Sequence, residues 1–218
     1  MTTTAVLSIA VRDGGYEPLL ELTTPRLAAW CNRHGYDLHL ERPRAPEGRG
    51  PAWAKIPEML ALLKVYDHVV LMDCDTVVMR TDEPFPFDKM RGEDRVMAVC
   101  EQEVPWAGEG FVPNTGVWGV TRGAIPLLQE IWDFPLYHNE PWMEQSAYMA
   151  VVGYTMTKPH PPLPMENWVA HRLFSLSKDW NVSASDTALL PTAIVRHASG
   201  LGIDFDQRVQ LMKGWLGE

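Results

Sequence analysis

Residues 65–79 read Val65-Tyr66-Asp67-His68-Val69-Val70-Leu71-Met72-Asp73-Cys74-Asp75-Thr76-Val77-Val78-Met79. The apolar run from Val69 to Met72 predicts a buried strand, and two carboxylates follow at its end. Because side chains alternate between the faces of an extended backbone, we expect Asp73 and Asp75 to point the same way and Cys74 to point back into the protein. Two converging carboxylates form half of a site for a hard divalent cation, at the strand end where open α/β sheets bind ligands.

The same acidic spacing occurs a second time, at Asp204-Phe205-Asp206. Acidic pairs of this kind are commonly solvated turn residues, so the tripeptide alone does not identify a site. The second pair opens a helical pattern that runs to about Leu216, where its carboxylates would offset the positive end of the helix dipole. We therefore predict that Asp204 and Asp206 stabilise a helix and that only the first pair binds an ion.

Composition limits the class of protein. A chain of 218 residues can bury a full core as one domain, with or without a lid. Hydrophobic residues at 46% and charged residues at 22% are typical of a soluble globular protein. The net charge of −9 disfavours diffuse binding to a nucleic-acid backbone, although it leaves a local basic groove open.

The three cysteines, Cys31, Cys74 and Cys100, are widely spaced in apolar contexts and form no Cys-x-x-Cys motif. They are predicted to be reduced core thiols, as in cytoplasmic proteins. The sequence contains neither a basic segment followed by a long apolar one at its start nor any stretch approaching 18 apolar residues. These features predict a cytoplasmic protein with no membrane partner.

The order of elements predicts an α/β fold. Ahead of the acidic pair we expect strands at 5–11, 36–40 and 69–73, with helices at 56–64 and from Tyr16, or more securely from Thr24 with Pro25 next, to Gly35. Beyond it we expect strands at 76–79, 95–100, 113–120 (with an Asn-Thr-Gly break) and 193–195, helices at 123–132, 141–151 and 204–216, and irregular chain at 106–112 and 153–164. Alternation of strand and helix is typical of a parallel sheet.

Five short segments then follow one another in a familiar order: Trp53-x-Lys55, Asp67-x5-Asp73-Cys74-Asp75, Asn114-Thr115-Gly116-Val117, Glu144-Gln145-Ser146-Ala147 and His197-x-x-Gly200. This series resembles the retaining glycosyltransferases with the GT-A fold. The α-galactosyl- and α-xylosyltransferase group is nearest, and the glycogenin-like group is more distant. The resemblance implies a Rossmann-like nucleotide-diphospho-sugar transferase fold with a mixed central sheet. It also implies one domain over 1–218, with a nucleotide-sugar half at about 1–120 and an acceptor half at about 121–218.

The resemblance implies a metal site. Asp75 and His197 would bind Mn²⁺ or Mg²⁺, and Asp73 would contact the metal or the sugar nucleotide. Carboxylate oxygen with neutral imidazole suits Mn²⁺ independently of the resemblance. A histidine considered alone is more often a satisfied surface or core residue.

Donor contacts are also implied by position. Asn114 would bind the sugar or the acceptor, Gly116 would allow close approach of backbone, and Lys55 would reach the diphosphate. Arg12 and Tyr16, beside the loop that follows the first strand, are candidate nucleotide contacts. The alternatives are a turn asparagine, an exposed lysine and a plain turn.

Gln145 and Glu144 match the helix start near the anomeric carbon and are the catalytic candidates; the alternative is a solvated helix face. No carboxylate is placed as a dedicated nucleophile, so we expect retention through the departing phosphate oxygen, with Gln145 or Glu144 stabilising positive charge. Trp142 and Trp168 are candidates for sugar stacking.

These observations predict a metal-dependent glycosyltransferase that moves a sugar from a nucleoside-diphosphate sugar to a saccharide, small-molecule, protein or modified nucleic-acid acceptor. The sequence departs from the family's late basic segment, because Lys213-Gly214-Trp215 lies well beyond His197. Two alternatives stay open: a nucleotide-sugar-binding module without transfer activity, and a glycosyltransferase dedicated to modified nucleic acid.

Overall fold

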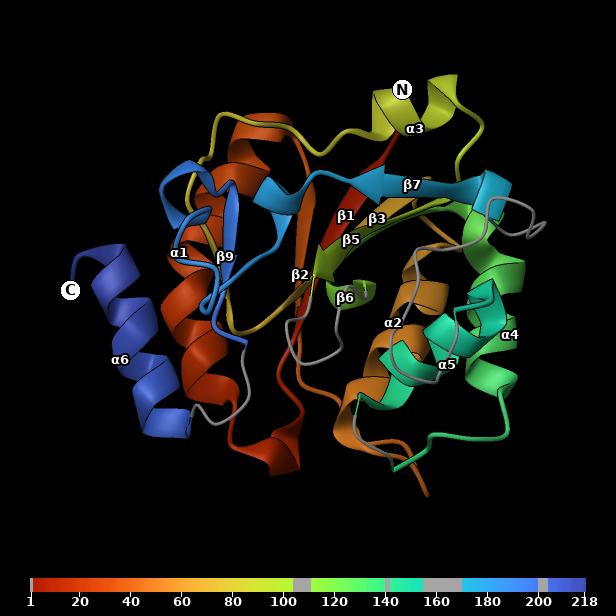
Figure 1. Ribbon diagram of the computed structural model, residues 1–218, viewed down its shortest axis with the longest axis horizontal. Coiled ribbons are helices and arrows are strands. Elements are labelled where there is room, and N and C mark those ends of the chain that lie inside the picture. The colour runs from red at the N-terminus through yellow and green to blue at the C-terminus, as the bar shows by residue number, and fades with distance from the viewer. Residues whose placement is uncertain (1, 104–110, 140–141, 155–169, 200–203) are drawn as a thin grey trace.

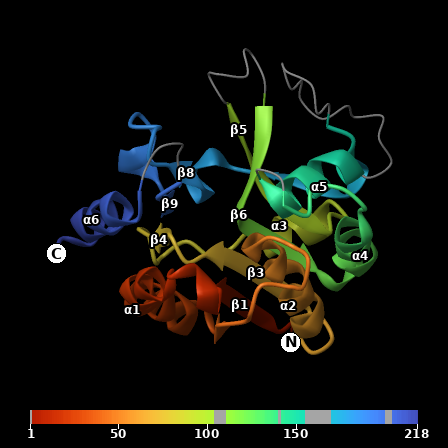
Figure 2. The same ribbon diagram turned by 90° about the horizontal axis from the view of Figure 1, so that it is seen from below.

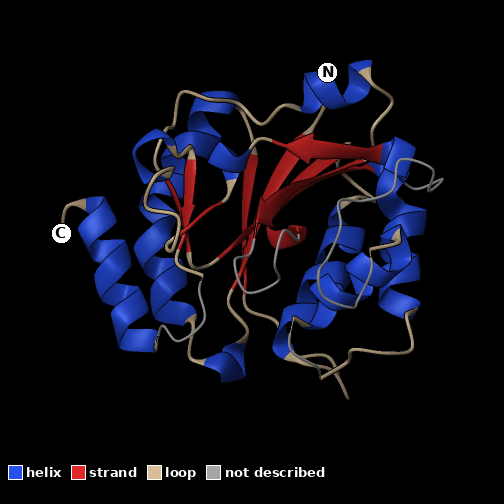
Figure 3. Ribbon diagram, viewed as in Figure 1, coloured by secondary structure: helices blue, strands red, loops and turns tan. Residues whose placement is uncertain are grey.

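A six-stranded mixed sheet forms the centre of the protein (Figure 3). The computed structural model describes residues 2–103, 111–139, 142–154, 170–199 and 204–218. The strands lie in the order β2 (Asp37–Glu41), β1 (Thr4–Ile9), β3 (His68–Asp73), β6 (Phe111–Thr121), β5 (Met97–Glu103) and β7 (Leu173–Leu176). Only β6 runs antiparallel to its neighbours, so the predicted mixed central sheet is confirmed.

Helices cover both faces of this sheet (Figure 1). On one face α2 (Lys55–Leu62), α4 (Ile125–Asp133) and α5 (Met143–Val152) pack against apolar side chains that include Leu7 and Leu71. On the other face α1 (Glu17–His34) packs against Val6, Val70 and Met72. Because both faces are buried, the central strands are apolar at nearly every position, which is why they read as continuous hydrophobic runs.

A second, three-stranded sheet continues the chain beyond the acidic pair. Its order is β4 (Thr76–Val78), β9 (Val195–His197) and β8 (Val182–Ser183). The register pairs Thr76 with His197 and Val78 with Val195. The last strand therefore lies two residues later than expected and contains His197. The sequence did not indicate β7 or β8, because strands of four and two residues carry too little periodic signal.

Helix α1 begins earlier than the preferred prediction, which places its start at Thr24. It begins at Glu17 and passes through Pro25, so Thr24 is not its N-cap. Proline removes a helix hydrogen bond, and the hydroxyls of the two preceding threonines engage carbonyls of that turn. Thr23 Oγ1 donates to the Leu19 carbonyl at 3.1 Å, and Thr24 Oγ1 donates to the Leu20 carbonyl at 2.6 Å. The predicted stop at Gly35 is confirmed, with φ at +68°.

The remaining helices include α3 (Phe87–Gly92), which follows Pro84 and Pro86, and α6 (Phe205–Leu216), which lies beside α1 (Figure 1 and Figure 2). Asp204 caps α6: its Oδ1 accepts from the Gln207 backbone N–H at 2.8 Å, and the Gln207 side chain accepts from the Asp204 N–H. The second acidic pair is therefore at a helix start, as predicted. Among the described residues no helix is long and apolar enough to cross a membrane; the cytoplasmic location stays a prediction.

Some predictions concern residues outside the described part of the chain. These are the sugar-stacking role of Trp168, the positions of Pro141 and Gly200, and most of the irregular segments 106–112 and 153–164. The Asn-Thr-Gly break lies within the described residues and is confirmed. Pairing of β5 jumps there from Val99↔Trp118 to Cys100↔Asn114, so residues 115–117 bulge out of the β5–β6 ladder.

Candidate functional site

Asp73 and Asp75 lie where the chain leaves the central sheet and enters the small one. Asp73 is the last residue of β3, and Asp75 immediately precedes β4. The turn is fixed by Thr76 Oγ1, which donates to the Asp73 carbonyl at 2.7 Å. Cys74 is buried in the apolar cluster shared by α1 and α6, so the prediction that it faces away is confirmed. All three cysteines are buried free thiols.

His197 joins the acidic pair because of strand pairing. The ladder that places Thr76 opposite His197 continues as a bond from the Ala198 N–H to the Asp75 carbonyl at 2.9 Å. His197 Nε2 lies 3.2 Å from Asp75 Oδ1. One ligand atom from each of Asp73, Asp75 and His197 lies within 4.8 Å of the other two. Residues 122 positions apart in sequence thus converge on one point.

Asn181 fixes the orientation of the His197 ring. The Asn181 side-chain amide donates through Nδ2 to the Asn114 carbonyl at 3.1 Å, which turns its Oδ1 toward His197 Nδ1 at 2.9 Å. Because that oxygen only accepts, Nδ1 carries the proton and donates. Nε2 therefore faces the acidic pair, which is the orientation of a metal-binding histidine, and an ion bound there would take the lone pair of this nitrogen.

Gly116 allows the imidazole to pack closely against β6. A Cβ at this position would lie 2.2 Å from His197 Cε1 and 2.6 Å from Nδ1. Asn114 holds the same bend, since its Oδ1 accepts from the Gly116 N–H at 2.9 Å. The group that approaches Gly116 closely is the His197 ring, and the predicted role of Gly116 beside the donor sugar stays a prediction.

Arg208, from α6, pairs with Asp75. Its Nη1 lies 2.8 Å from Asp75 Oδ2, so both oxygens of this buried carboxylate have a nitrogen partner. Burial alone would raise the pKa of Asp75, but His197 and Arg208 outweigh it and hold that pKa at about 2. Asp75 is itself buried, at 7% exposed.

Asp73 has a basic partner of its own, Lys55 from α2. Its Nζ lies 2.8 Å from Asp73 Oδ1 and 2.9 Å from Glu144 Oε1. Burial would lower the pKa of Lys55, but the two carboxylates outweigh it and raise that pKa. The alternative of an exposed lysine is wrong, because the side chain is 11% exposed and held by two carboxylates.

Glu144 and Gln145 lie in the first turn of helix α5, beside Thr115. Thr115 Oγ1 donates to Glu144 Oε1 at 3.1 Å, and the Thr115 N–H donates to Gln145 Oε1 at 3.2 Å. Glu144 is 2% exposed, which excludes the solvated helix face for this residue. Trp142 and Met143, just before it, have φ values of +71° and +40°. Consecutive left-handed residues other than glycine cost energy and persist only where packing holds them, as at functional sites. The half-buried Trp142 packs against the core, and its stacking role stays a prediction.

Tyr16 and Arg12 lie differently with respect to this centre. Tyr16 is 37% exposed. Its ring lies edge-on to Phe205 at 6.1 Å between centroids, and the Arg208 guanidinium lies 5.9 Å from the Tyr16 ring centroid. Tyr16 therefore reaches the metal-site residues through Arg208. Arg12 is exposed, and its Nε donates to the Arg42 carbonyl at 2.6 Å.

The donor set fits a divalent cation. Two ligands of one ion with bonds of about 2.1 Å lie about 3 Å apart when they are adjacent, which matches the 3.2 Å between His197 Nε2 and Asp75 Oδ1. The set contains carboxylate oxygen and imidazole nitrogen and no thiolate, which argues against a structural zinc site.

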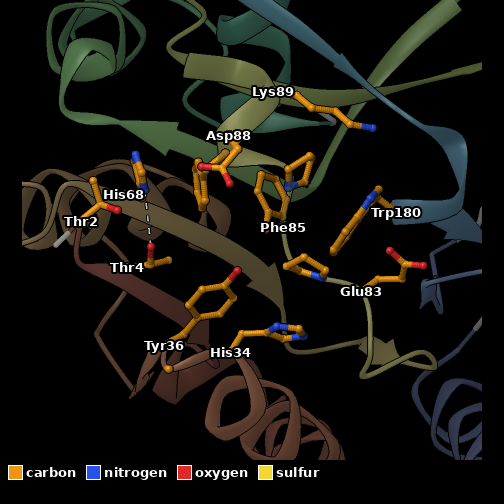
Figure 4. A pocket seen from close by; sticks show the side chains of 14 residues that line it. Thr2, Thr4, His34, Tyr36, His68, Glu83, Phe85, Asp88, Lys89 and Trp180 are labelled. Carbon is orange, nitrogen blue, oxygen red and sulfur yellow. Dashed lines mark hydrogen bonds between the residues drawn. The ribbon is translucent and has the colours of Figure 1, made fainter. Parts of the chain in front are cut away.

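A separate cavity of about 460 Å³ lies at the other end of β3 (Figure 4). Tyr36, Phe85 and Trp180 line it, with His68 at the start of β3. Its lining contains none of the predicted site residues.

Sequence reasoning missed Arg208, Asn181 and the role of Thr115. Arg208 and Asn181 lie in segments without a recognisable motif, and only the packing of α6 and the segment before β8 brings them to the acidic pair. Thr115 is within the Asn-Thr-Gly segment, so the signal was present but was assigned to its neighbours.

No protein-family model and no curated protein matches the sequence. Solved structures do match. A glycosyltransferase involved in the glycosylation of the major capsid of PBCV-1 has a TM-score of 0.71 and 16% identity, over 97% of this chain and 99% of that one. The bifunctional glycosyltransferase WbbM has a TM-score of 0.58 and 12% identity, over 97% of this chain and 50% of that one. GlyE of Streptococcus pneumoniae TIGR4 has a TM-score of 0.58 and 12% identity, over 98% and 60%. This chain thus spans roughly half of WbbM and three-fifths of GlyE. The likeness establishes the GT-A fold.

Proposed function

We propose that the protein is a metal-dependent glycosyltransferase that moves a sugar from a nucleoside-diphosphate sugar to an acceptor hydroxyl, with retention of configuration. The observation that carries this proposal is the convergence of Asp73, Asp75 and His197 at the carboxyl end of β3. That strand end is where α/β sheets bind ligands, and the fold around it is that of solved glycosyltransferases.

Asp75 and His197 would hold the divalent cation, with Asp73 as the third ligand or as a donor contact. A cation bound there would neutralise negative charge on the departing diphosphate. Asn181 keeps His197 Nε2 directed at the site, and Gly116 leaves room for the ring. Mn²⁺ and Mg²⁺ are the candidates.

The donor would lie along the same edge of the sheet, in the half of the domain formed by residues 1–120. Tyr16 is exposed and adjoins Arg208, which supports Tyr16 as a nucleotide contact. Arg12, four residues before it in the sequence, is the second candidate contact. Asn114 and Gly116 remain the proposed sugar contacts. Lys55 would act on the diphosphate side by keeping Asp73 oriented.

For the chemistry, Gln145 is favoured over Glu144 as the group that touches the donor. Glu144 is nearly fully buried, and its Oε1 already accepts from Lys55 and Thr115. Gln145 is less buried and uses only its oxygen within the described part of the chain, which leaves its amide N–H groups for a substrate. The departing phosphate oxygen would then take the acceptor proton on the same face of the sugar.

One observation favours a second mechanism. Glu144 Oε2 is buried and has no hydrogen-bond partner among the described residues. A buried carboxylate oxygen that has no partner among the described residues, on a side chain whose other oxygen contacts Lys55, is a candidate nucleophile for double displacement through a covalent glycosyl-enzyme.

The proposal is tested by a thermal-shift panel of nucleoside diphosphates and their sugars, each with and without Mn²⁺. A ligand at 100 times its Kd stabilises by about 2.7 kcal/mol, which corresponds to roughly 5–10 °C in a chain of this size. We expect one nucleotide to produce such a shift only with the metal. Absence of any metal-dependent shift across the panel contradicts the proposal. Binding with slow donor hydrolysis and no transfer to any acceptor class would instead indicate a binding module, and product anomers by NMR decide retention.

A further inference from the structure

We infer that Arg208 is a positioning residue that couples metal binding to diphosphate binding: it holds Asp75 while the diphosphate is absent and binds the diphosphate when it arrives. The inference rests on the proposed function. It starts from the ion pair between Arg208 Nη1 and Asp75 Oδ2 at 2.8 Å, a pair that the sequence did not indicate.

The charge balance of the site is the first step. Three carboxylates lie there, those of Asp73, Asp75 and Glu144. Two basic side chains, Lys55 and Arg208, form ion pairs with them. Lys55 contacts Asp73 and Glu144, and Arg208 alone among the lysines and arginines contacts Asp75 within the described residues. A divalent cation bound by Asp75 must therefore enter beside an existing positive charge. The repulsion weakens binding of the metal alone, and an anionic diphosphate relieves it.

The second step is the unused capacity of the guanidinium. An arginine has five N–H donors in a planar fork that matches the oxygens of a phosphate group. Only Nη1 of Arg208 has an acceptor among the described residues; its Nε is buried and has none there. Such a group, next to the carboxylate that would hold the metal, is suited to bind an oxyanion that shares the same ion.

The third step is the anchoring of Arg208. It lies one turn after Phe205 on α6, whose N-terminus is closed by the Asp204 capping box, and Phe205 packs edge-on against Tyr16. The guanidinium lies over the Tyr16 ring, 5.9 Å from its centroid. The same helix face thus contacts both the proposed metal ligand and the proposed nucleotide contact, so a small side-chain rotation can change the partner of Arg208 without moving the helix.

The experiment uses the full chain with two probes, MnCl₂ alone and inorganic pyrophosphate. Free Mn²⁺ is measured by its EPR signal, and pyrophosphate binding to the Mn²⁺-saturated protein is measured by tryptophan fluorescence. In Arg208→Gln we expect Mn²⁺ alone to bind about 5-fold more tightly, because a positive charge is removed. We expect pyrophosphate to bind about 10–100-fold more weakly, the size of one lost charge-assisted hydrogen bond.

Two further variants make the result decisive. Arg208→Lys keeps the charge and should give intermediate values for both probes. Lys213→Gln removes the same charge from the same helix and should change neither. Unchanged binding of both probes in Arg208→Gln overturns the inference, and so does parallel weakening of both, which would indicate a structural role only.

Failure of the proposed function looks different. There, no nucleotide produces a metal-dependent shift in the wild type, whatever Arg208→Gln does to Mn²⁺. A wild-type response in the nucleotide panel with no Arg208 effect refutes only the inference.

Discussion

The two carboxylates of the acidic pair are two residues apart, yet they belong to different environments. Asp73 faces α2 and α5, where Lys55 binds both its carboxylate and that of Glu144. Asp75 faces β9 and α6, where His197 and Arg208 take one oxygen each. The Asp73 side contains a buried lysine shared by two acids. The Asp75 side contains an imidazole nitrogen held ready by Asn181.

The difference shows how one short motif serves two purposes. On the Asp73 side the charges are paired within the protein, so that cluster is suited to hold residues in place. On the Asp75 side the pairing is with a histidine nitrogen that can bind a metal and an arginine that can bind an anion. We therefore expect substitutions on the Asp73 side to act mainly on stability and turnover, and those on the Asp75 side to act mainly on metal and nucleotide binding.

The largest effect is expected for Asp75→Asn. Metal-dependent nucleotide binding should fall below detection, because loss of a charged ligand exceeds the 10–100-fold typical of losing an outer partner. Calorimetric titration of the nucleotide found in the thermal-shift panel, with Mn²⁺, measures it. The variant should also be less stable, since Arg208 loses its partner. Unchanged metal-dependent binding would remove Asp75 from the metal site.

Lys55→Met is expected to have the largest effect on stability. It leaves Asp73 and Glu144 buried without their cation, which should cost about 3–5 kcal/mol in urea unfolding. Lys64→Met, at an exposed position just beyond α2, is the control and should be nearly neutral. Adding Glu144→Gln to Lys55→Met should recover part of the loss. A small effect of Lys55→Met would mean that water solvates the two carboxylates well enough to replace Lys55.

Gln145→Ala should lower turnover by roughly 10–100-fold while donor affinity hardly changes, because the lost hydrogen bond acts as charge develops in the transition state. Steady-state kinetics with the identified donor measures both quantities. Glu144→Gln is the matched comparison. A larger loss there, or a glycosyl adduct on Glu144 seen by mass spectrometry, would favour double displacement.

The smallest effect is expected at the second acidic pair. Asp204→Ala removes the side-chain cap of α6 and should lower the free energy of unfolding by about 1 kcal/mol. Mn²⁺ affinity should not change, because Asp204 is outside the cluster formed by Asp73, Asp75 and His197. A large loss of Mn²⁺ affinity would mean that the two acidic pairs had been assigned the wrong way round.

The local features could be predicted from the sequence because each is set by neighbours along the chain. Period-two alternation places Cys74 opposite the two aspartates, and Asp204 followed by Gln207 encodes the α6 cap. The start of α1 was misjudged because Pro25 normally lies in the first turn of a helix, whereas here the helix begins at Glu17 and passes through Pro25. His197 was correctly linked to Asp75 by resemblance, but no local pattern contains the β4–β9 pairing that joins them.

The sequence by itself determined the alternation of strands and helices and the acidic pair at the end of a buried strand. It also determined that Cys74 points away from the two aspartates. Only the tertiary structure decided which basic side chain pairs with which carboxylate. Lys55 meets Glu144 across 89 positions, and Arg208 meets Asp75 across 133. Such contacts depend on how the helices pack on the sheet. That packing is driven by burial of apolar surface, which is non-directional and does not determine which polar side chains come into contact. The contacts of His197 with Asn181, which orients its ring, and with Gly116, which leaves room for it, likewise depend on the tertiary structure.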